Sequence, residues 1–221
     1  VVGPQARQPC RADHPMLQLA MQGDGACAAL VVHFLLQQGN RLLGHRLTVG
    51  SPEAEQTGVI PRRSGQAAEG RFFPDTYTYG KGSSDLRLYA RALKAMDRQI
   101  ARIWQDRAPG LPLHTPDEAL VLASIIEKET GQAGERTMIA SVFINRLRIG
   151  MKLQTDPTVI YGLGAGFDGD LRKRDLLTDT PYNTYTRTGL PPTPIAMPGL
   201  AALNAALHPA ASRALYFVAR G

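Results

Sequence analysis

Cysteine is nearly missing from this sequence, and the common metal-binding patterns are missing altogether. Cys10 and Cys27 are its only thiols. Two cysteines are too few for a disulfide framework or a cysteine-based zinc site. The sequence also contains no C-x-x-C and no H-E-x-x-H pattern, which are the usual zinc signatures. We therefore expect a protein that holds no metal.

Long hydrophobic runs are also lacking. The longest apolar stretch, ACAALVVHFLL at 26–36, is interrupted by His33, and a transmembrane helix needs about 20 apolar residues in a row. The opening residues VVGPQARQPCRADHP do not have the layout of a signal peptide. We therefore expect no membrane anchor or targeting segment within this chain.

Neither sign of charge forms a long block, although the overall balance is basic. The net charge is +6 and the pI about 9.6, which favours an anionic partner such as nucleic acid, an acidic membrane face or an anionic polymer. The basic residues are scattered, however, and RKR at 172–174 is the one cluster. Aromatic residues do not alternate with basic ones along a stripe, as they do in many nucleic-acid-binding surfaces. We expect no nucleic-acid partner.

Two common enzyme signatures are absent as well. The sequence has no G-x-S-x-G pattern, so a Ser–His–Asp triad cannot be argued. The glycines of YGLGAG at 161–166 do not lie between a strand and a helix, as a phosphate-binding loop requires. The chemistry of this chain must therefore lie in other residues.

The sequence changes character near Glu69. Residues 1–68 are rich in Gln, Gly, Arg and Pro and show little periodicity, although 16–47 are apolar enough for one or two helices. We expect residues 1–68 to be a region outside the folded domain, either disordered, divergent or read in a wrong frame. We expect residues 69–221 to form the folded domain.

Helix signals become consistent after Glu69. RFFPDTYTYG at 71–80 contains Pro74 and reads as an edge strand or loop. Thr115 followed by a proline, with Glu118 three residues later, predicts a capping box at a helix start. The expected helices are 84–105, 116–130, 135–149 and 200–207. In the third of these, the predicted buried face consists of Met138, Ile139, Val142, Phe143 and Leu147.

Two glutamates close the second predicted helix, in LASIIEKET at 122–130. With Leu122 at 0° and about 100° per residue, Glu129 falls at about 340°, on the same face as the apolar residues before it. Glu127 falls at about 140°, which predicts a solvent-facing side chain. A carboxyl at the edge of an apolar face and in the last helical turn has a raised pKa, as a general acid needs. The alternative is that Glu129 is simply a solvated residue at a helix end.

Polar residues in the later loops are further candidates. Gln154, Thr155 and Asp156 in KLQTDPT could bind a polar ligand, or Asp156 could form a turn before the next proline. YNTY at 182–185 could hydrogen-bond and stack on a sugar, or could hold its own loop through side-chain to backbone bonds. Asn145 and Arg146 close a helix, where an arginine often only complements the helix dipole.

Several segments together resemble the endolytic murein transglycosylases, also called the YceG-like family. They are EGRFFPDTY at 69–77, the long run from LASIIEKETGQ to TVIYG at 122–162, and YNTYTRTGLPPTPIAMPG at 182–199, with HPA at 208–210 and LYFVA at 215–219. The resemblance covers residues 69–221. It does not extend to residues 1–68, where the family has a transmembrane helix and a LysM-like module, and it implies that the chain stops short of the family's C-terminal end.

The resemblance implies an activity and a site. The activity is non-hydrolytic cleavage of peptidoglycan glycan strands between N-acetylmuramic acid and N-acetylglucosamine, which leaves a 1,6-anhydro end and needs no cofactor. Glu129 matches the family's catalytic acid. The implied substrate-binding residues are Gln154, Thr155, Asp156, Tyr182, Asn183, Thr184 and Tyr185. The implied supporting residues are Glu127, Asn145, Arg146 and Tyr161.

The resemblance also implies a setting. The partners would be peptidoglycan glycan strands and peptidoglycan synthases, at the periplasmic face of a bacterial inner membrane. We expect an α+β fold, a helical catalytic domain with short strands and long Pro- and Gly-rich loops, in which Glu129 faces a cleft. The alternative function is a non-catalytic glycan-binding fragment of the same family, inactive because terminal segments are lost.

Overall fold

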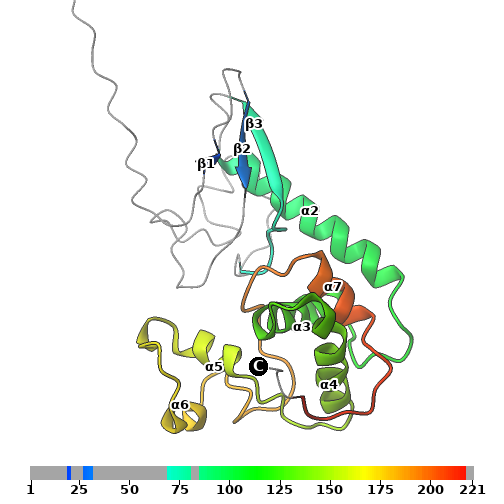
Figure 1. Ribbon diagram of the computed structural model, residues 1–221, viewed down its shortest axis with the longest axis vertical. Helices are drawn as coiled ribbons and strands as arrows, with labels where there is room; N and C mark the ends of the chain where they lie inside the picture. Colours follow the sequence, from blue (N-terminus) through cyan, green and yellow to red (C-terminus); the bar gives the residue numbers. More distant parts are fainter. Residues whose placement is uncertain (1–18, 21–26, 32–68, 81–84, 218–221) are drawn as a thin grey trace, which may run out of the picture.

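The computed structural model of the chain describes residues 19–20, 27–31, 69–80 and 85–217. It combines a small antiparallel sheet with a larger helical body (Figure 1). The strands are β1 (Leu19–Ala20), β2 (Cys27–Val31) and β3 (Thr76–Gly80). The helices are α2 (Asp85–Gln105), α3 (Pro116–Glu129), α4 (Arg136–Arg148), α5 (Asp156–Leu163), α6 (Lys173–Leu177) and α7 (Leu200–Leu207), with short 3-10 turns at Ala133–Glu135 and Gly164–Gly166. The described part is therefore mostly helical with few strands, in keeping with the expected mixed class.

The sheet has the order β1-β2-β3, and both pairings are antiparallel. Val31 pairs with Thr76 and Cys27 with Gly80. β3 therefore lies at one edge of the sheet, and Pro74 precedes it, which agrees with the expectation of an edge segment. The segment 27–31, which the composition of 16–47 allowed to be helical, is a strand. Two short strands from residues 1–68 thus pair with the domain predicted to start at Glu69.

Helix α2 begins and ends where the sequence predicts. It runs diagonally from the sheet to the far end of the molecule (Figure 1). Its buried side chains recur at helical spacing on one face, because only that face meets the rest of the protein. They include Ala92, Leu93, Met96, Ile100 and Ile103.

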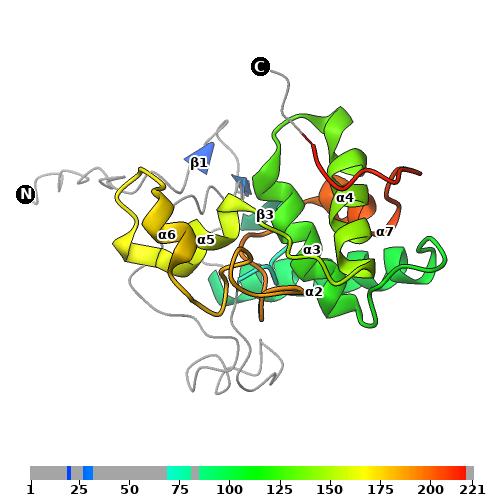
Figure 2. The same cartoon turned by 90° about the horizontal axis from the view of Figure 1, so that it is seen from below.

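Helix α3 forms the centre of the body, between α4 and α7 on one side and α5 on the other (Figure 2). Thr115 Oγ1 accepts a hydrogen bond from the Glu118 backbone N–H at 3.2 Å, as the predicted capping box requires. The Glu118 carboxylate, however, accepts from His114 N at 2.6 Å and not from Thr115 N. Every residue from Ala119 to Ile126 is buried, so this stretch of α3 has no solvent-facing side.

Helices α4 and α7 complete the core around α3. α7 has the predicted bounds, and Leu203 and Leu207 are fully buried. On α4, Ile139, Val142 and Phe143 are buried as predicted. Met138 does not belong to the buried face, because its side chain is 45% exposed. The prediction for Met138 is therefore wrong.

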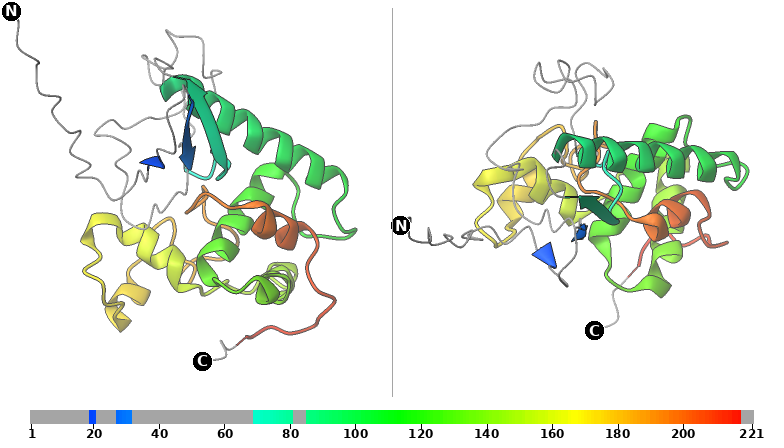
Figure 3. Two further views of the ribbon diagram at one scale, coloured as in Figure 1. Left: turned by 45° about the horizontal axis from the view of Figure 1, so that its top comes forward. Right: turned by 90° about the horizontal axis from the view of Figure 1, so that it is seen from above.

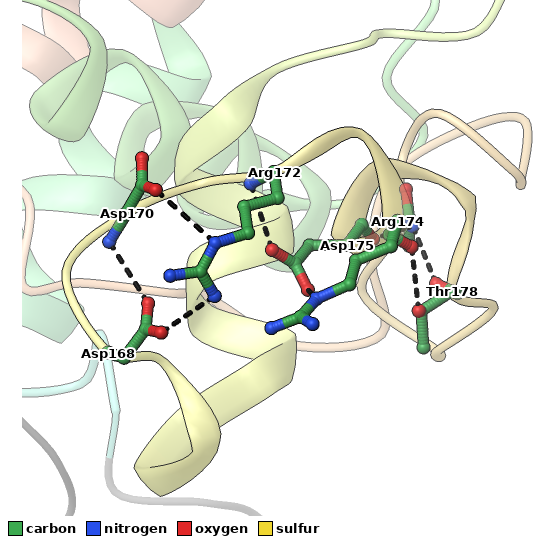
Figure 4. Close-up of polar contacts among 7 residues, drawn as sticks. Asp168, Asp170, Arg172, Arg174, Asp175 and Thr178 are labelled. Atoms are coloured by element: carbon green, nitrogen blue, oxygen red, sulfur yellow. Dashed lines mark hydrogen bonds and ion pairs between the residues drawn. The ribbon is translucent and has the colours of Figure 1, made fainter.

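Helices α5 and α6 form a separate lobe beside α3 (Figure 3). The sequence does not predict α5, because Asp156 and the proline after it read as a turn; Asp156 instead opens the helix, with the proline in its first turn. Figure 4 shows the polar contacts that hold the α6 end of this lobe. Arg172 contacts Asp168 at 2.7 Å and Asp170 at 3.3 Å, and its backbone N–H donates to Asp175.

The basic cluster RKR at 172–174 is thus partly neutralised within its own lobe, since Arg174 also lies 3.6 Å from Asp175. No helix in the described part of the chain is long and apolar enough to cross a membrane.

Candidate functional site

Glu129 is the last residue of α3, and its carboxylate is the centre of a small polar network. Thr155 Oγ1 donates a hydrogen bond to Glu129 Oε2 at 2.6 Å. The Glu129 side chain is half-buried, whereas Thr155 is 2% exposed. Among the described residues, no hydrogen bond reaches the second carboxylate oxygen, Oε1. The structure therefore leaves one oxygen of Glu129 available for a ligand.

Burial raises the pKa of Glu129 above its ordinary value. The Thr155 hydrogen bond opposes this effect, because it stabilises the ionised form; the nearby charge of Asp156 raises the pKa and that of Arg146 lowers it. The net direction is upward, as the helix position suggested. Glu129 is thus a carboxyl that retains its proton to a higher pH than a solvated glutamate does.

The backbone at Gln154 turns Thr155 toward Glu129. Gln154 has a φ of +48°, a left-handed conformation that is uncommon for a residue other than glycine. Its N–H donates to Thr184 O at 3.1 Å, and Thr155 N donates to Thr184 Oγ1 at 3.1 Å. Thr184 Oγ1 also lies 2.8 Å from Thr158 Oγ1. Local strain held by surrounding hydrogen bonds is common at functional sites.

Thr158 and Thr184 therefore position Thr155 and do not themselves face a ligand, since they are 0% and 3% exposed. Thr158 is not among the predicted site residues. Its place one turn after Thr155 on α5 could have suggested it only if α5 had been recognised as a helix. The Gln154 side chain, by contrast, is exposed beside the network and remains a predicted binding residue.

Asn183 holds its own loop through side-chain to backbone hydrogen bonds. This is the second of the two alternatives for YNTY, the first being sugar binding. It is fully buried. Its side-chain NH₂ donates to the carbonyl oxygens of Leu176 at 3.1 Å and Thr178 at 2.7 Å, and its Oδ1 accepts from Tyr185 N at 2.8 Å. A side chain with its hydrogen bonds used in this way fixes the loop and has no group left for a sugar.

Tyr185 and Asp156 form a second polar pair at the site. Tyr185 Oη donates to Asp156 Oδ1 at 2.5 Å. The pKa of Tyr185 is raised, first by burial and then by this hydrogen bond to a carboxylate. Asp156 lies close enough to Glu129 for its negative charge to raise the pKa of Glu129. The structure therefore brings Asp156 and Tyr185 together with Glu129 and Thr155.

Arg146 does more than complement a helix dipole. It is 6% exposed, and its guanidinium donates to Leu215 O at 2.7 Å and to Leu153 O. It therefore ties the segment before Gln154 to the C-terminal segment. Asn145 acts similarly, since its side-chain NH₂ donates to Ser212 O and Ala214 O. Both residues therefore hold the C-terminal segment against α4.

Glu127 differs from its prediction. Its side chain is 29% exposed, and its Oε2 accepts a hydrogen bond from Gly199 N at 3.0 Å. Gly199 is the N-cap of α7, where a negative charge is favourable. The expectation of a solvent-facing side chain is wrong, because α7 packs against the side of α3 that the helical wheel left open. Glu127 anchors α7 and is directed away from the Thr155 network.

Tyr161 and Tyr182 pack against each other on the α5 side of the site, with ring centroids 4.8 Å apart. Tyr182 Oη lies 2.7 Å from Thr193 Oγ1. Glu69 is the first residue of the segment EGRFFPDTY and has no predicted role. It lies near Tyr161 and is half-buried. Burial raises the pKa of Glu69 to about 7, against a lowering by Lys128. No periodic pattern in the sequence signals this burial, because Glu69 lies in a turn.

The network offers one proton-holding carboxyl with a fixed hydrogen-bond donor. Such a group can protonate a leaving oxygen and can take a proton back in a later step. In the part of the chain that the structure describes, no group of three or more His, Cys, Asp or Glu side chains could hold a metal ion. The raised pKa of Glu129 and its hydrogen bond from Thr155 suit acid–base chemistry by this carboxyl.

Comparison with known proteins identifies similar sequences and a similar structure. A family model described as the YceG-like family matches residues 19–221. An endolytic murein transglycosylase of Bacillus subtilis is 37% identical over 171 residues, which are 76% of this chain and 46% of that protein. One from Streptococcus pneumoniae serotype 2 is 34% identical over 156 residues, 68% of this chain and 28% of that protein. The chain thus spans less than half the length of these curated relatives.

A solved structure resembles the fold as well. The 2.6 Å crystal structure of a yceG-like protein from Listeria monocytogenes superimposes with a TM-score of 0.63 at 37% identity, and the match covers 77% of this chain and 59% of that one. The family match starts at residue 19, well before the boundary expected at Glu69. It therefore includes the segments of β1 and β2.

Proposed function

The chain belongs to the YceG-like family, and from that premise we propose that it cleaves peptidoglycan glycan strands as an endolytic lytic transglycosylase. The observation that carries the proposal is the carboxyl of Glu129, half-buried, raised in pKa and held by Thr155 at 2.6 Å. The curated relatives are named endolytic murein transglycosylases. For this chain, the lytic activity, the glycosidic bond that it cleaves and the anhydro product are all part of the proposal.

The proposed reaction uses Glu129 twice. Protonated Glu129 donates its proton to the glycosidic oxygen between N-acetylmuramic acid and N-acetylglucosamine. The C1–O bond breaks, and its electron pair stays on the departing oxygen, which becomes a hydroxyl. The C6 hydroxyl oxygen of the muramic acid bonds to C1, and its proton passes to the Glu129 carboxylate. The sugar ends as a 1,6-anhydro ring, and Glu129 is protonated again.

This route explains why one acid is enough. A glycoside hydrolase places two carboxyls about 5 to 9.5 Å apart to act as acid and as base or nucleophile. Here the nucleophile is a hydroxyl of the substrate, so no second carboxyl is needed to activate water. Asp156, the other carboxyl of the network, already accepts a hydrogen bond from Tyr185. Its proposed role is to bind or orient and to keep the pKa of Glu129 high.

The remaining site residues divide by exposure. Gln154, Asp156, Tyr182 and Tyr185 have exposed or half-buried side chains that could contact sugar hydroxyl or acetamido groups. Thr155 holds Glu129, and Thr184 holds Thr155. We further propose peptidoglycan synthases as partners and the periplasmic face of a bacterial inner membrane as the location.

Product analysis tests the function. Purified protein is expected to release fragments ending in 1,6-anhydro-N-acetylmuramic acid from peptidoglycan sacculi. Each such end is lighter than a hydrolysed end by one water molecule, so mass spectrometry distinguishes the two reactions. Reducing ends would contradict the lytic mechanism. Glycan binding without any cleavage would support the alternative, a glycan-binding fragment.

Replacing Thr155 with valine is expected to move the pH profile of cleavage to higher pH. The Thr155 hydrogen bond lowers the pKa of Glu129, so its removal raises that pKa further. Because the reaction needs protonated Glu129, the alkaline limb of kcat/KM against pH should shift upward. The expected maximum rate falls about tenfold, as the carboxyl loses its fixed orientation.

The control for this experiment is Thr178→Val. Thr178 is an exposed threonine of the α6 lobe, and its hydroxyl donates to Arg174 O. This variant should leave the position of the alkaline limb unchanged. An unshifted limb in Thr155→Val would contradict the assignment of that limb to Glu129.

A further inference from the structure

Glu69 is a carboxyl that the proposed reaction does not use. It lies in the turn before β3, in the segment EGRFFPDTY, and its side chain is half-buried. In the described part of the chain, no hydrogen bond or ion pair reaches its carboxyl group. A desolvated acid without a partner is unfavourable in its ionised form. Among the described residues, no group uses the hydrogen-bonding capacity of this carboxyl, which leaves it free to bind a ligand.

The surroundings of Glu69 place it beside the site. Two groups interact electrostatically with it: Lys128, which directly precedes Glu129 on α3, and Tyr161, on α5. Lys128 is exposed, so its charge is largely screened by solvent. The Glu69 carboxyl therefore lies between the end of α3 and the tyrosine pair of α5 and the YNTY loop.

A series of contacts links the turn that carries Glu69 to Tyr161. Gly70 packs so closely on Pro194 that a Cβ on Gly70 would lie 2.3 Å from the Pro194 Cβ. The neighbouring Thr193 is hydrogen-bonded to Tyr182, and the Tyr182 ring packs on Tyr161. Tyr161 in turn lies near enough to Glu69 for the Glu69 charge to raise its pKa. The turn that carries Glu69 is thus held by backbone packing, and the Glu69 carboxyl makes no hydrogen bond to the described residues.

The Tyr161 hydroxyl, like the Glu69 carboxyl, has no hydrogen-bond partner among the described residues. Its pKa is raised, first by burial and then by the Glu69 charge. Its partner Tyr182, by contrast, has its hydroxyl bonded to Thr193. Two neighbouring O–H groups, one acid and one phenol, therefore lack acceptors among these residues. The ligand that satisfies both is one acceptor oxygen with two lone pairs.

We propose that Glu69 and Tyr161 form a sugar subsite beside Glu129, in which both donate hydrogen bonds to the acetamido carbonyl oxygen of a glycan sugar. The inference rests on the proposed function, because it takes the ligand to be an N-acetylated glycan. Every sugar of such a strand carries this carbonyl. A neutral carboxylic acid can donate to it, and a carboxylate cannot.

Binding at this subsite depends on pH in a defined direction. Glu69 has a pKa of about 7, so it is mostly neutral at pH 6 and mostly ionised at pH 8. Covering it with a sugar removes more water and further disfavours the ionised form. The neighbouring groups do not reverse this direction, because the raised pKa of Tyr161 keeps it neutral in this range and the charge of the exposed Lys128 is screened by solvent. Glycan binding is therefore strongest below the pKa and weakens as pH rises through it.

The test measures the dissociation constant of peptide-free glycan strands from pH 6 to pH 8. The Glu129→Gln variant of the chain is used, because it removes cleavage and the titration of Glu129. The neutral fraction of a group with pKa 7 falls from about nine-tenths to about one-tenth over this range. Kd should therefore rise about tenfold. A Kd that stays flat would overturn the subsite.

Matched variants locate the effect. Adding Glu69→Gln should make Kd constant within about twofold over this range, because the amide NH₂ donates at every pH. Adding Tyr161→Phe should raise Kd a few-fold at all pH values and leave its slope. Adding Asp106→Asn, at a side chain that is 93% exposed, should leave the pH dependence of Kd as it is in the Glu129→Gln variant alone. A slope that survives Glu69→Gln would overturn the assignment.

Two further comparisons test which sugar group is bound, and whether the subsite or the proposed reaction fails. An N-acetylglucosamine oligomer should show the pH dependence, and a glucose oligomer of the same length should not. Equal slopes for both would overturn the acetamido assignment. Cleavage with pH-independent binding would contradict the subsite alone, whereas pH-dependent binding without anhydro products would contradict the lyase alone. Absence of both binding and cleavage would contradict both.

Discussion

Replacing Glu129 with glutamine is expected to lower kcat for glycan cleavage by about 10²- to 10⁴-fold, the usual contribution of a general acid. The amide has nearly the shape of the acid, and it can still accept the hydrogen bond that Thr155 donates to Oε2. It cannot deliver a proton or recover one from the C6 hydroxyl. Glycan binding should change little, so the loss should appear in kcat and not in KM. Release of anhydro-muropeptides under saturating substrate measures it.

Glu127→Gln is the matched control, two residues away on the same helix. The carbonyl oxygen of the new amide can still accept from Gly199 N, which Glu127 binds at 3.0 Å. Turnover should stay within about twofold of the wild type. The variant loses the favourable interaction of the charge with the α7 N-terminus, about 0.3–1 kcal/mol, and the 4.0 Å ion pair with Arg136. Comparable losses of turnover in both variants would contradict the division of roles between the two glutamates.

Replacing Gly70 with alanine is expected to lower the free energy of unfolding by about 2–5 kcal/mol. Two effects add. The new Cβ would lie 2.3 Å from Pro194 Cβ and 2.6 Å from Pro194 Cγ, so the loop at 193–196 must move. The φ of +77° also disfavours any residue with a Cβ. Urea unfolding followed by circular dichroism measures the change.

Gly150→Ala separates the two effects. Gly150 also has a positive φ, +67°, but nothing lies within 4 Å of a Cβ placed there. Only the backbone term of about 1–2 kcal/mol should remain. Equal destabilisation of the two variants would show that the contact between Gly70 and Pro194 contributes nothing. Because this contact also fixes Glu69, Gly70→Ala should weaken glycan binding where the folded protein persists.

The helices are the most predictable part of this protein. α2, α3 and α7 have clear start signals or regular apolar spacing, and all three lie where the sequence places them. α5 escapes prediction because Asp156 and a proline are equally typical of a turn and of a first helical turn. Strand β2 escapes it as well, because its ladder partner β3 is far away in the sequence.

The residues of the site were likewise predictable only where neighbours in the sequence decide their surroundings. The helical wheel selects Glu129 correctly as the residue at the edge of the apolar face, and the structure shows it half-buried. The same wheel fails for Glu127, because it describes one helix alone and α7 covers the other side of α3. For YNTY, the sequence leaves binding and loop support open; the buried hydrogen bonds of Asn183 show loop support for that residue, while Tyr182 and Tyr185 stay predicted binding residues.

By itself, the sequence determined where most helices run, which carboxyl lies at the edge of the apolar face of α3, and which family the segments resemble. These properties depend on residues close together in the chain, through helical spacing, caps and local motifs. The tertiary structure alone decided that Thr155 holds Glu129 across 26 positions of sequence, that Glu127 anchors α7, and that Glu69 lies near Tyr161. Such contacts follow from how separate elements pack, and no local pattern encodes the partner that burial brings to a side chain.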